Sequence, residues 1–149
     1  MATVDSTVNS SDPVSTTGPD IAERLKAAGL RPTRQRLLLG TLLFGKGDRH
    51  VTAELLHAEV VASGERVSVA TVYNALHQFC EAGLLRELAI EGSKAYFDTN
   101  TSNHNHFYVE GEGRLMDIDG DAIRVAGLPE PPDGMKIGYI DVVVRLVRK

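Results

Sequence analysis

The stretch Ser68-Val-Ala-Thr-Val-Tyr-Asn74 decides how the first half of the chain is expected to fold. Ser68 is a favoured helix N-cap, so the pattern predicts a helix over about 69–82, ending at Gly83. Apolar residues recur at helical spacing along one side of it: Val69, Val72, Leu76 and Phe79. The other side carries small and polar residues, as a helix that enters the DNA major groove requires. The stretch therefore predicts a recognition-type helix.

The sequence on either side of this helix predicts three helices before it and a β-hairpin after it. Capping residues and apolar spacing predict three helices before it, over about 21–28, 33–44 and 52–63. After it, two strand-like runs flank Glu91-Gly-Ser93 as a hairpin, over 85–90 and 94–98. Together these elements predict a winged helix-turn-helix.

The second half of the chain is strand-like. The pattern predicts strands over 106–110 and 114–118, a brief helix over 120–126 and a long strand over 135–147. A sheet of about fifty residues is marginal alone, so pairing with a second copy is expected. The fold class is thus predicted as α+β, an N-terminal winged helix-turn-helix followed by a small α/β dimerisation domain. The predicted domains are a disordered leader at 1–19, the DNA-binding domain at 20–98 and the dimerisation and sensing domain at 99–149.

Composition limits the classes of protein to consider. The 149 residues include no secretory signal and no apolar run approaching a membrane span, so a cytoplasmic protein without a membrane partner is predicted. The single cysteine, Cys80, excludes an internal disulfide and a CxxC zinc clamp. Net charge is −4, but residues 21–49 hold seven basic residues against two acidic ones. Because phosphate attraction is local, this basic region is compatible with DNA.

The candidate DNA contacts lie on the recognition-type helix and at the start of the second helix. Small residues let the backbone approach the groove, Tyr73 suits a thymine methyl or a phosphate, and Asn74 suits adenine. The arginines suit phosphate or minor-groove contacts. For Tyr73 a half-buried packing role is the open alternative, and for Asn74 an ordinary exposed position. The full candidate set is Arg31, Arg34, Arg36, Ala70, Thr71, Tyr73 and Asn74.

A second group of residues suggests a ligand site. Residues i and i+2 of a strand share a face, so His104 and His106 can present two imidazoles to one ion. Three residues elsewhere could complete a mixed nitrogen and oxygen set, which suits Fe²⁺ or Mn²⁺ and admits Zn²⁺. The expected metal ligands are His50, Asp98, His104, His106 and Asp117. Haem held by His104 and His106 as axial ligands is the alternative. Outside the set, His57 is expected to be structural and Cys80 a small core residue.

Several motifs occur together in a fixed order, and the combination is specific. They are Gly29-Leu-Arg-Pro-Thr-Arg-Gln-Arg36, His50-Val-Thr-Ala-Glu54, Ala70-Thr-Val-Tyr-Asn74 and the His104-x-His106 strand. On these the chain resembles the ferric uptake regulator superfamily over about residues 20–147. Further stretches make it most similar to the iron response regulator branch of alphaproteobacteria: Leu43-Phe-Gly-Lys-Gly47, Ala70-Thr-Val-Tyr-Asn-Ala-Leu76, Phe97-Asp-Thr-Asn100 and Asp141-Val-Val-Val-Arg145.

The resemblance implies a dimeric repressor or activator that binds a double-stranded operator of the iron-control-element type. It places the regulatory metal site on the same five residues, and the aspartates at 98 and 117 match peroxide-sensing relatives, which use bound iron to oxidise a ligand histidine. Tyr73 is carried over as a base contact, whereas Asn74 replaces an arginine common in ferric uptake regulators. No structural zinc held by four cysteines is expected because CxxC pairs are absent. Asn103, Asn105 and Ile140 stand where a second metal site would need ligands, so none is expected there.

The leading functional hypothesis is a DNA-binding transcriptional regulator of iron and haem homeostasis, controlled by haem or iron at His104 and His106. The alternative within regulators is a peroxide- or divalent-metal sensor that uses all five ligands. A small metal-dependent hydrolase would need a general base beside the metal, and the sequence offers none, so the chain is not expected to be an enzyme. A winged helix that binds partners without any ligand is the remaining alternative.

Overall fold

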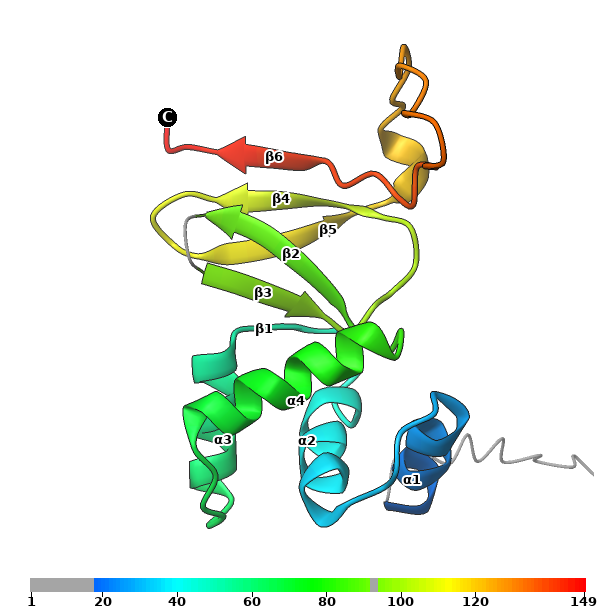
Figure 1. Cartoon of the computed structure of the whole chain (residues 1–149). Helices are drawn as coiled ribbons and strands as arrows, with labels where there is room; N and C mark the ends of the chain where they lie inside the picture. The colour runs from blue at the N-terminus through cyan, green and yellow to red at the C-terminus, as the bar shows by residue number, and fades with distance from the viewer. Residues whose placement is uncertain (1–17, 92–93) are drawn as a thin grey trace, which may run out of the picture.

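The computed structural model describes residues 18–91 and 94–149, so most of the predicted leader and the tip of the wing lie outside the described residues. Figure 1 shows the helices at one end of the molecule and the strands at the other. The elements are α1 (Gly18–Ala27), α2 (Arg34–Phe44), β1 (His50–Val51), α3 (Ala53–Ala62), α4 (Val69–Glu81), β2 (Arg86–Glu91), β3 (Lys94–Asp98), β4 (Asn105–Val109), β5 (Arg114–Ile118), η1 (Gly120–Ala122) and β6 (Val143–Leu146).

The predicted caps start three of the helices. The side chains of Thr33, Thr52 and Ser68 each accept a hydrogen bond from the backbone N–H three residues later. The α4 stripe is buried at Val72, Leu76 and Phe79, but Val69 is 41% exposed, so its expected place on the buried stripe was wrong. Val69 is the first residue of α4, beside the cap, and Ala75 is buried on the helix in addition.

The helices enclose one apolar core. Every helix from α1 to α4 contributes fully buried side chains, among them Ile21, Leu39, Leu56 and Phe79. Gly40 allows α1 to approach α2 closely, because a Cβ on Gly40 would lie 2.7 Å from Cγ2 of Ile21. This core supports α4 and leaves its outer face exposed.

The strands form two separate three-stranded sheets. β1, β3 and β2 pair antiparallel in that order and make the wing, while the second sheet has the order β5-β4-β6 with β6 parallel to β4. A small apolar cluster joins the sheets, with Leu88, Ile90, Tyr96 and Tyr108 buried at its centre. The α+β class with a winged helix is therefore confirmed.

Two expected elements of the second half were wrong in extent. The strand predicted over 135–147 is limited to Val143–Leu146, because its partner β4 begins only at Asn105 and pairs with β6 from His106 onward. The helix predicted over 120–126 is a single 3₁₀ turn, Gly120–Ala122.

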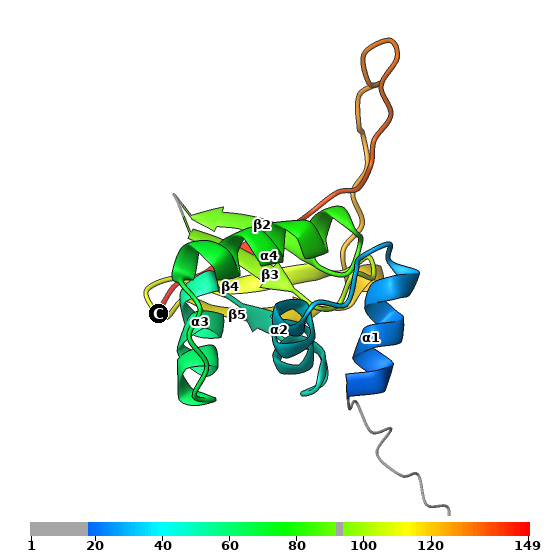
Figure 2. The same cartoon turned by 60° about the horizontal axis from the view of Figure 1, so that its bottom comes forward.

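Residues 123–142 instead form an arm between η1 and β6. Its middle projects away from the rest of the molecule in both views (Figures 1 and 2), and its end returns to the body, where Tyr139 and Asp141 contact Arg86. Its large apolar side chains are exposed: Val125, Leu128, Met135, Ile137 and Tyr139. Of the helices that the structure describes, none combines the length and the hydropathy needed to span a bilayer.

Candidate metal centre and nucleic-acid face

Two cross-strand pairs, one from each sheet, build the expected ligand cluster. In the wing His50 of β1 lies opposite Asp98 of β3, and in the second sheet His106 of β4 lies opposite Asp117 of β5. His104 precedes β4 and points to the same side as His106, as the two-residue period of an extended chain requires. Residues from both predicted domains therefore meet at one place.

The ligand atoms converge closely. Asp98 Oδ2 lies 2.8 Å from His104 Nε2, 2.9 Å from His106 Nε2 and 3.1 Å from His50 Nε2. Asp117 Oδ1 lies 2.9 Å from His50 Nε2, 3.3 Å from His104 Nε2 and 3.4 Å from His106 Nε2. One ligand atom from each of the five residues lies within 4.8 Å of all the others.

These separations fit ligands of one small divalent ion. Metal–nitrogen and metal–oxygen bonds of about 2.1 Å place donors at right angles about 3.0 Å apart. Each of the two carboxylate oxygens lies 2.8–3.4 Å from all three imidazole nitrogens, so the five residues could hold one ion together. The mixed nitrogen and oxygen donors suit Fe²⁺ or Mn²⁺ and also admit Zn²⁺.

Neighbouring groups hold the ligands in the orientation that a metal needs. The N–H of Asn100 donates to Asp98 Oδ1 at 2.9 Å, which leaves Oδ2 directed at the imidazoles. His104 Nδ1 lies 2.8 Å from the carbonyl oxygen of Ser102, which can only accept, so a ring that binds an ion through Nε2 would keep its proton on Nδ1. The Nε2 lone pair then faces the cluster. Sequence reasoning missed Asn100 and Ser102, although a run of Asp, Thr, Asn and Ser is typical of turns with side-chain to backbone bonds.

Burial and charge distinguish the ligands. Asp98 is 1% exposed, whereas the Asp117 side chain is 42% exposed and forms the open side of the cluster. Burial alone would raise the pKa of Asp98, but bonds from His106, His50 and the Asn100 N–H outweigh it and hold that pKa well below its usual range. Burial alone would lower the pKa of His50, but Asp98 and Asp117 outweigh it, so that pKa is raised. Two carboxylates therefore face three imidazoles at short range, a donor set of the kind that divalent metal ions bind.

The cluster is tied directly to the helical end of the molecule. The N–H of Arg49, next to His50, donates to Thr99 Oγ1 at 2.9 Å, and the Thr99 N–H donates to the Arg49 carbonyl at 3.1 Å. The Arg49 guanidinium forms a half-buried ion pair with Glu59 of α3, which raises the pKa of Arg49. The residue next to His50 is therefore linked directly to α3.

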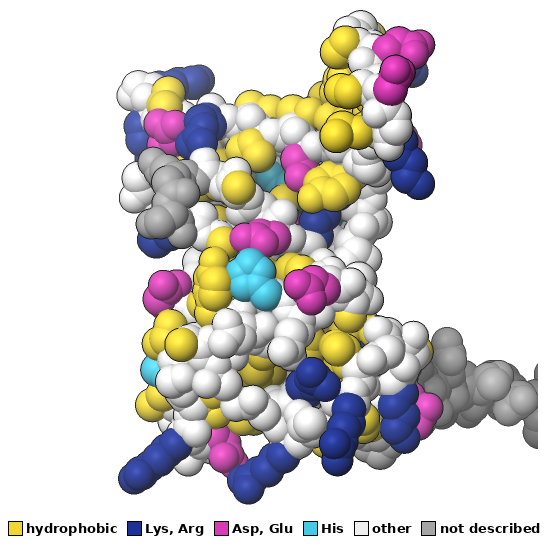
Figure 3. All heavy atoms as spheres, in the orientation of Figure 1, with side chains coloured by type: hydrophobic (Ala, Val, Ile, Leu, Met, Phe, Trp, Pro, Cys, Tyr) yellow, Lys and Arg dark blue, Asp and Glu magenta, His cyan; other side chains and the backbone are white. Residues whose placement is uncertain are grey.

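The expected DNA contacts lie on one exposed face beside α4. Figure 3 shows Lys and Arg side chains along the helical end of the molecule. Ala70 and Asn74 are exposed, and Thr71 is half-buried with its hydroxyl 2.8 Å from that of Ser68. A hollow of about 280 Å³ separates α4 from the start of α2, with Arg36, Thr71 and Asn74 in its lining.

The remaining candidates of this face are partly engaged within the chain. Tyr73 is 39% exposed and stacks edge-on against His77 at 4.5 Å between ring centroids, so it has both a packing contact and a free edge. Arg34 pairs with Glu65 at 3.0 Å, and Arg36 donates to Gln78 at 3.0 Å. Arg31 is exposed.

Two residues that were expected to lie outside the ligand set, His57 and Cys80, do so. His57 Nε2 lies 2.8 Å from the Val67 carbonyl, away from the metal cluster. Cys80 is half-buried against the helical core, and burial raises the pKa of its thiol to about 12, which keeps it unreactive.

Comparison with known proteins places these features in a family. The model of the ferric uptake regulator family matches residues 27–132. The ferric uptake regulation protein of Shigella flexneri is 36% identical over 101 residues, covering 67% of this chain and 68% of that protein. The corresponding protein of Vibrio cholerae is 33% identical over 106 residues, covering 70% and 71%.

Solved structures support the same family assignment. The crystal structure of the Vibrio cholerae ferric uptake regulator superposes with a TM-score of 0.65 at 25% identity, covering 85% of this chain and 98% of that one. The structure of the ferric uptake regulator from Pseudomonas aeruginosa with manganese gives a TM-score of 0.64 at 26% identity, covering 87% and 98%. These relatives are regulators rather than enzymes, so the hydrolase alternative is set aside.

Proposed function

The chain belongs to the ferric uptake regulator family, and we propose that it is a homodimeric, sequence-specific transcriptional regulator controlled by one iron-class divalent ion. The proposed ligands are His50, Asp98, His104, His106 and Asp117. The observation that carries the proposal is the convergence of these side chains, from both sheets, to within 4.8 Å. The relative from Pseudomonas aeruginosa with manganese supports the choice of ion.

The location of the ligands suggests how an ion would change DNA affinity. His50 and Asp98 belong to the winged-helix part, whereas the other three follow the turn at 99–103. An ion held by both groups fixes the angle between the winged helix and the second sheet. In a homodimer that angle sets the distance between two recognition helices, and hence the fit to two half-sites.

For DNA recognition we propose α4 as the helix that enters the major groove. Ala70 and Thr71 would face the groove closely, and Tyr73 and Asn74 would reach base edges. Arg31, Arg34 and Arg36 would contact phosphates or the minor groove. The exposed, basic face beside α4 supports this assignment.

For the homodimer we propose the second sheet and the arm as the contact region. Before its end returns to Arg86, the arm carries exposed apolar side chains at Val125, Leu128 and Met135. Its middle projects from the rest of its own chain (Figure 2). A second copy would cover this surface, which is otherwise unfavourable in water.

The finer assignment, to the iron response regulator branch with haem as the signal, rests on sequence stretches such as Phe97-Asp-Thr-Asn100. Haem would use His104 and His106, whose ring centroids lie 4.5 Å apart and whose Nε2 atoms both approach Asp98 Oδ2. Axial ligands of one haem lie on opposite faces of the porphyrin, so haem binding would require this segment to open. The present convergence favours the alternative, a divalent-metal or peroxide sensor of the same family.

Operator binding tests the proposal. We expect fluorescence anisotropy on an iron-control-element duplex to show at least tenfold tighter binding with Mn²⁺ than in chelator, and Asp98→Asn to remove that gain. Asn74→Ala should weaken binding with the Mn²⁺ gain intact. If haem rather than Mn²⁺ changes the affinity, and His104→Ala with His106→Ala abolishes the haem absorption band, the haem assignment replaces the metal one. Equal affinity in all conditions contradicts the sensor proposal.

A further inference from the structure

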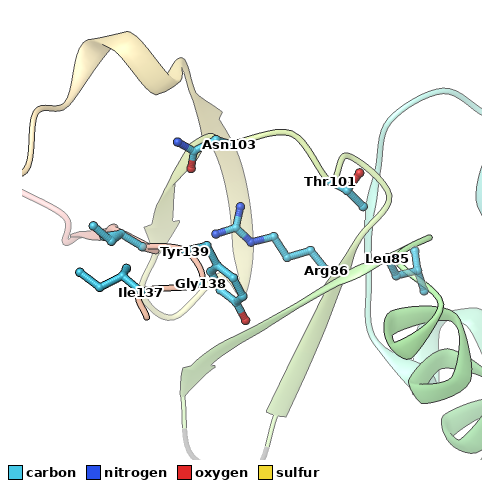
Figure 4. Close-up of a pocket in the computed structure, with 9 residues that line it drawn as sticks. Leu85, Arg86, Thr101, Asn103, Ile137, Gly138 and Tyr139 are labelled. Carbon is cyan, nitrogen blue, oxygen red and sulfur yellow. The ribbon is translucent and has the colours of Figure 1, made fainter. Parts of the chain in front are cut away.

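A second hollow, separate from the metal cluster, lies between the start of the wing and the end of the arm. Its volume is about 540 Å³, enough for a small organic molecule. Figure 4 shows that its walls come from β2, from the turn before β4 and from the segment leading to β6. The lining residues are Gly83, Leu85, Arg86, Thr101, Asn103, Ile137, Gly138, Tyr139 and Ile140.

The chemistry of this lining excludes a metal ion and favours an anion. Its members include neither a carboxylate nor an imidazole. Arg86, only 9% exposed, is the charged group of the lining, and its guanidinium carbon lies 4.4 Å from the Tyr139 ring centroid. In Figure 4 the Arg86 side chain extends toward Gly138 and Tyr139.

Arg86 is incompletely paired. Its Nη1 donates to the Ser102 carbonyl at 3.4 Å, and its Nη2 pairs with one oxygen of Asp141. Its Nε is buried and has no hydrogen-bond partner among the described residues. The Nε and Nη2 N–H groups form the edge of a guanidinium that binds a carboxylate through two parallel bonds, and Asp141 uses only one of them. A buried donor without a partner is costly, so this edge is suited to a better ligand.

The remaining walls suit an apolar body. Leu85, Ile137, Ile140 and the Tyr139 ring supply apolar surface. A Cβ on Gly138 would meet nothing within 4 Å, so the backbone there leaves the space open.

We propose that this cavity binds a small organic carboxylate with an apolar or aromatic body. Its carboxylate takes the Nε and Nη2 edge of Arg86, and Asp141, whose side chain is 29% exposed, moves into water. One carboxylate replaces another, so the buried guanidinium stays neutralised.

The site also has a direct connection to the metal cluster. Arg86 lies opposite Asp98 in the wing, and the residue after Asp141 accepts a hydrogen bond from the His106 N–H at 3.1 Å. Binding at Arg86 should therefore alter metal affinity, and by thermodynamic linkage the reverse holds equally. This coupling, unlike the binding itself, rests on the proposed function.

The test is a fluorescence titration of the full metal-free chain with 2-naphthoate, and with 2-naphthalenemethanol as the uncharged ligand of the same shape. We expect a dissociation constant on the order of 0.1–1 mM for the acid, as a ligand of this size allows, and at least tenfold weaker binding of the alcohol. Asp141→Asn removes the competing carboxylate and should tighten acid binding several-fold, whereas Arg86→Gln should abolish the preference for the acid.

Two further variants test whether the acid and the alcohol bind in this cavity or at another place on the protein. Gly138→Leu fills the cavity without backbone strain, since Gly138 has no positive φ, and should remove binding of both ligands. Val61→Ala, at an exposed position of α3 outside the cavity lining, is the control and should bind normally. Equal binding of acid and alcohol, unchanged binding by Gly138→Leu or weaker binding by Asp141→Asn overturns the inference.

The two proposals fail separately. If the cavity inference is wrong but the metal proposal is right, naphthoate does not bind and Mn²⁺ still tightens operator binding. If naphthoate binds at Arg86 and Mn²⁺ has no effect on the operator, the carboxylate site stands and the metal proposal fails.

Discussion

The helical core and the layer where the two sheets meet are built on opposite principles. The core between α1 and α4 is apolar throughout, whereas every buried polar or charged residue among those described lies between Arg86 and His106. Apolar burial stabilises the first region without help. The second region encloses carboxylates and imidazoles that need partners, and a bound ion would supply one. The helical core thus supports the proposed recognition helix. The layer between the two sheets, called the joint below, would instead depend on a bound ligand.

The largest expected effect concerns the helical core. Phe79→Ala removes a fully buried ring of α4 and should lower the free energy of unfolding by about 3–5 kcal/mol. Because Phe79 belongs to α4 and is not one of the proposed ligands, denaturant titrations with Mn²⁺ and with chelator should give the same loss. Leu128→Ala on the exposed arm is the control, with little change expected in dilute monomer. A loss that disappears with Mn²⁺ would break the distinction between the regions.

The next effect concerns the joint. Asp98→Asn keeps the shape of the side chain but removes the charge that all three imidazoles approach. We expect Mn²⁺ affinity to fall at least 100-fold, since even residues that only orient metal ligands cost 10–100-fold. Calorimetric titration measures this, with Asp119→Asn as a nearby exposed control. Unchanged affinity would remove Asp98 from the ligand set.

A smaller effect tests how α1 is attached to the core. Gly40→Ala places a Cβ about where Ile21 packs and should cost about 1–3 kcal/mol by overpacking. Thermal unfolding should detect it, and Ile21→Val in the same chain should recover part of the loss. Helix propensity alone would predict that Gly40→Ala stabilises the protein. That result would show that α1 can move away from α2 without loss of stability.

The smallest effect is the pH dependence of the metal-free joint. The raised pKa of His50 gives stability that is present below its ordinary value of 6.5 and is lost as pH rises through the folded pKa. The lowered pKa of Asp98 gives stability that is present above its ordinary value of 3.8 and is lost as pH falls through the folded pKa. In chelator the joint should thus be most stable between these values, changing by at most about 1.4 kcal/mol per pH unit for each group.

Metal binding should show the opposite trend. The ion requires neutral imidazoles, so Mn²⁺ affinity should rise as pH increases toward the pKa of His50 and should level off above it, where protons no longer compete for the ring. Thermal melts at several pH values, with chelator and with Mn²⁺, give both trends. Parallel pH curves in the two conditions would contradict an ion at these imidazoles.

Much of the helical half could be predicted from the sequence because its signals are local. Thr33, Thr52 and Ser68 start helices by bonds to residues three positions away, and the apolar spacing of α4 identifies most of its buried side. The grouping of the ligands was also predicted, from strand periodicity and from family motifs. The structure adds the register, with His50 opposite Asp98 and His106 opposite Asp117.

The second half was harder to predict because its structure depends on distant partners. The β-branched run ending at Val147 is strand-like along its length, yet only the part beside β4 finds a partner. The Arg86–Asp141 pair joins residues 55 positions apart, and no local sequence pattern predicts it. Non-local pairing therefore decides both the arm and the cavity at its base.

The central claim is that one ion is held by side chains from both parts of the chain, and calorimetric titration of the metal-free protein with Mn²⁺ tests it most directly. We predict one ion per chain, with His50→Ala from the winged-helix part and His104→Ala from the second part each weakening that same site at least tenfold. If His50→Ala leaves the affinity unchanged while His104→Ala abolishes binding, the ion is held by one part alone and cannot set the angle between them.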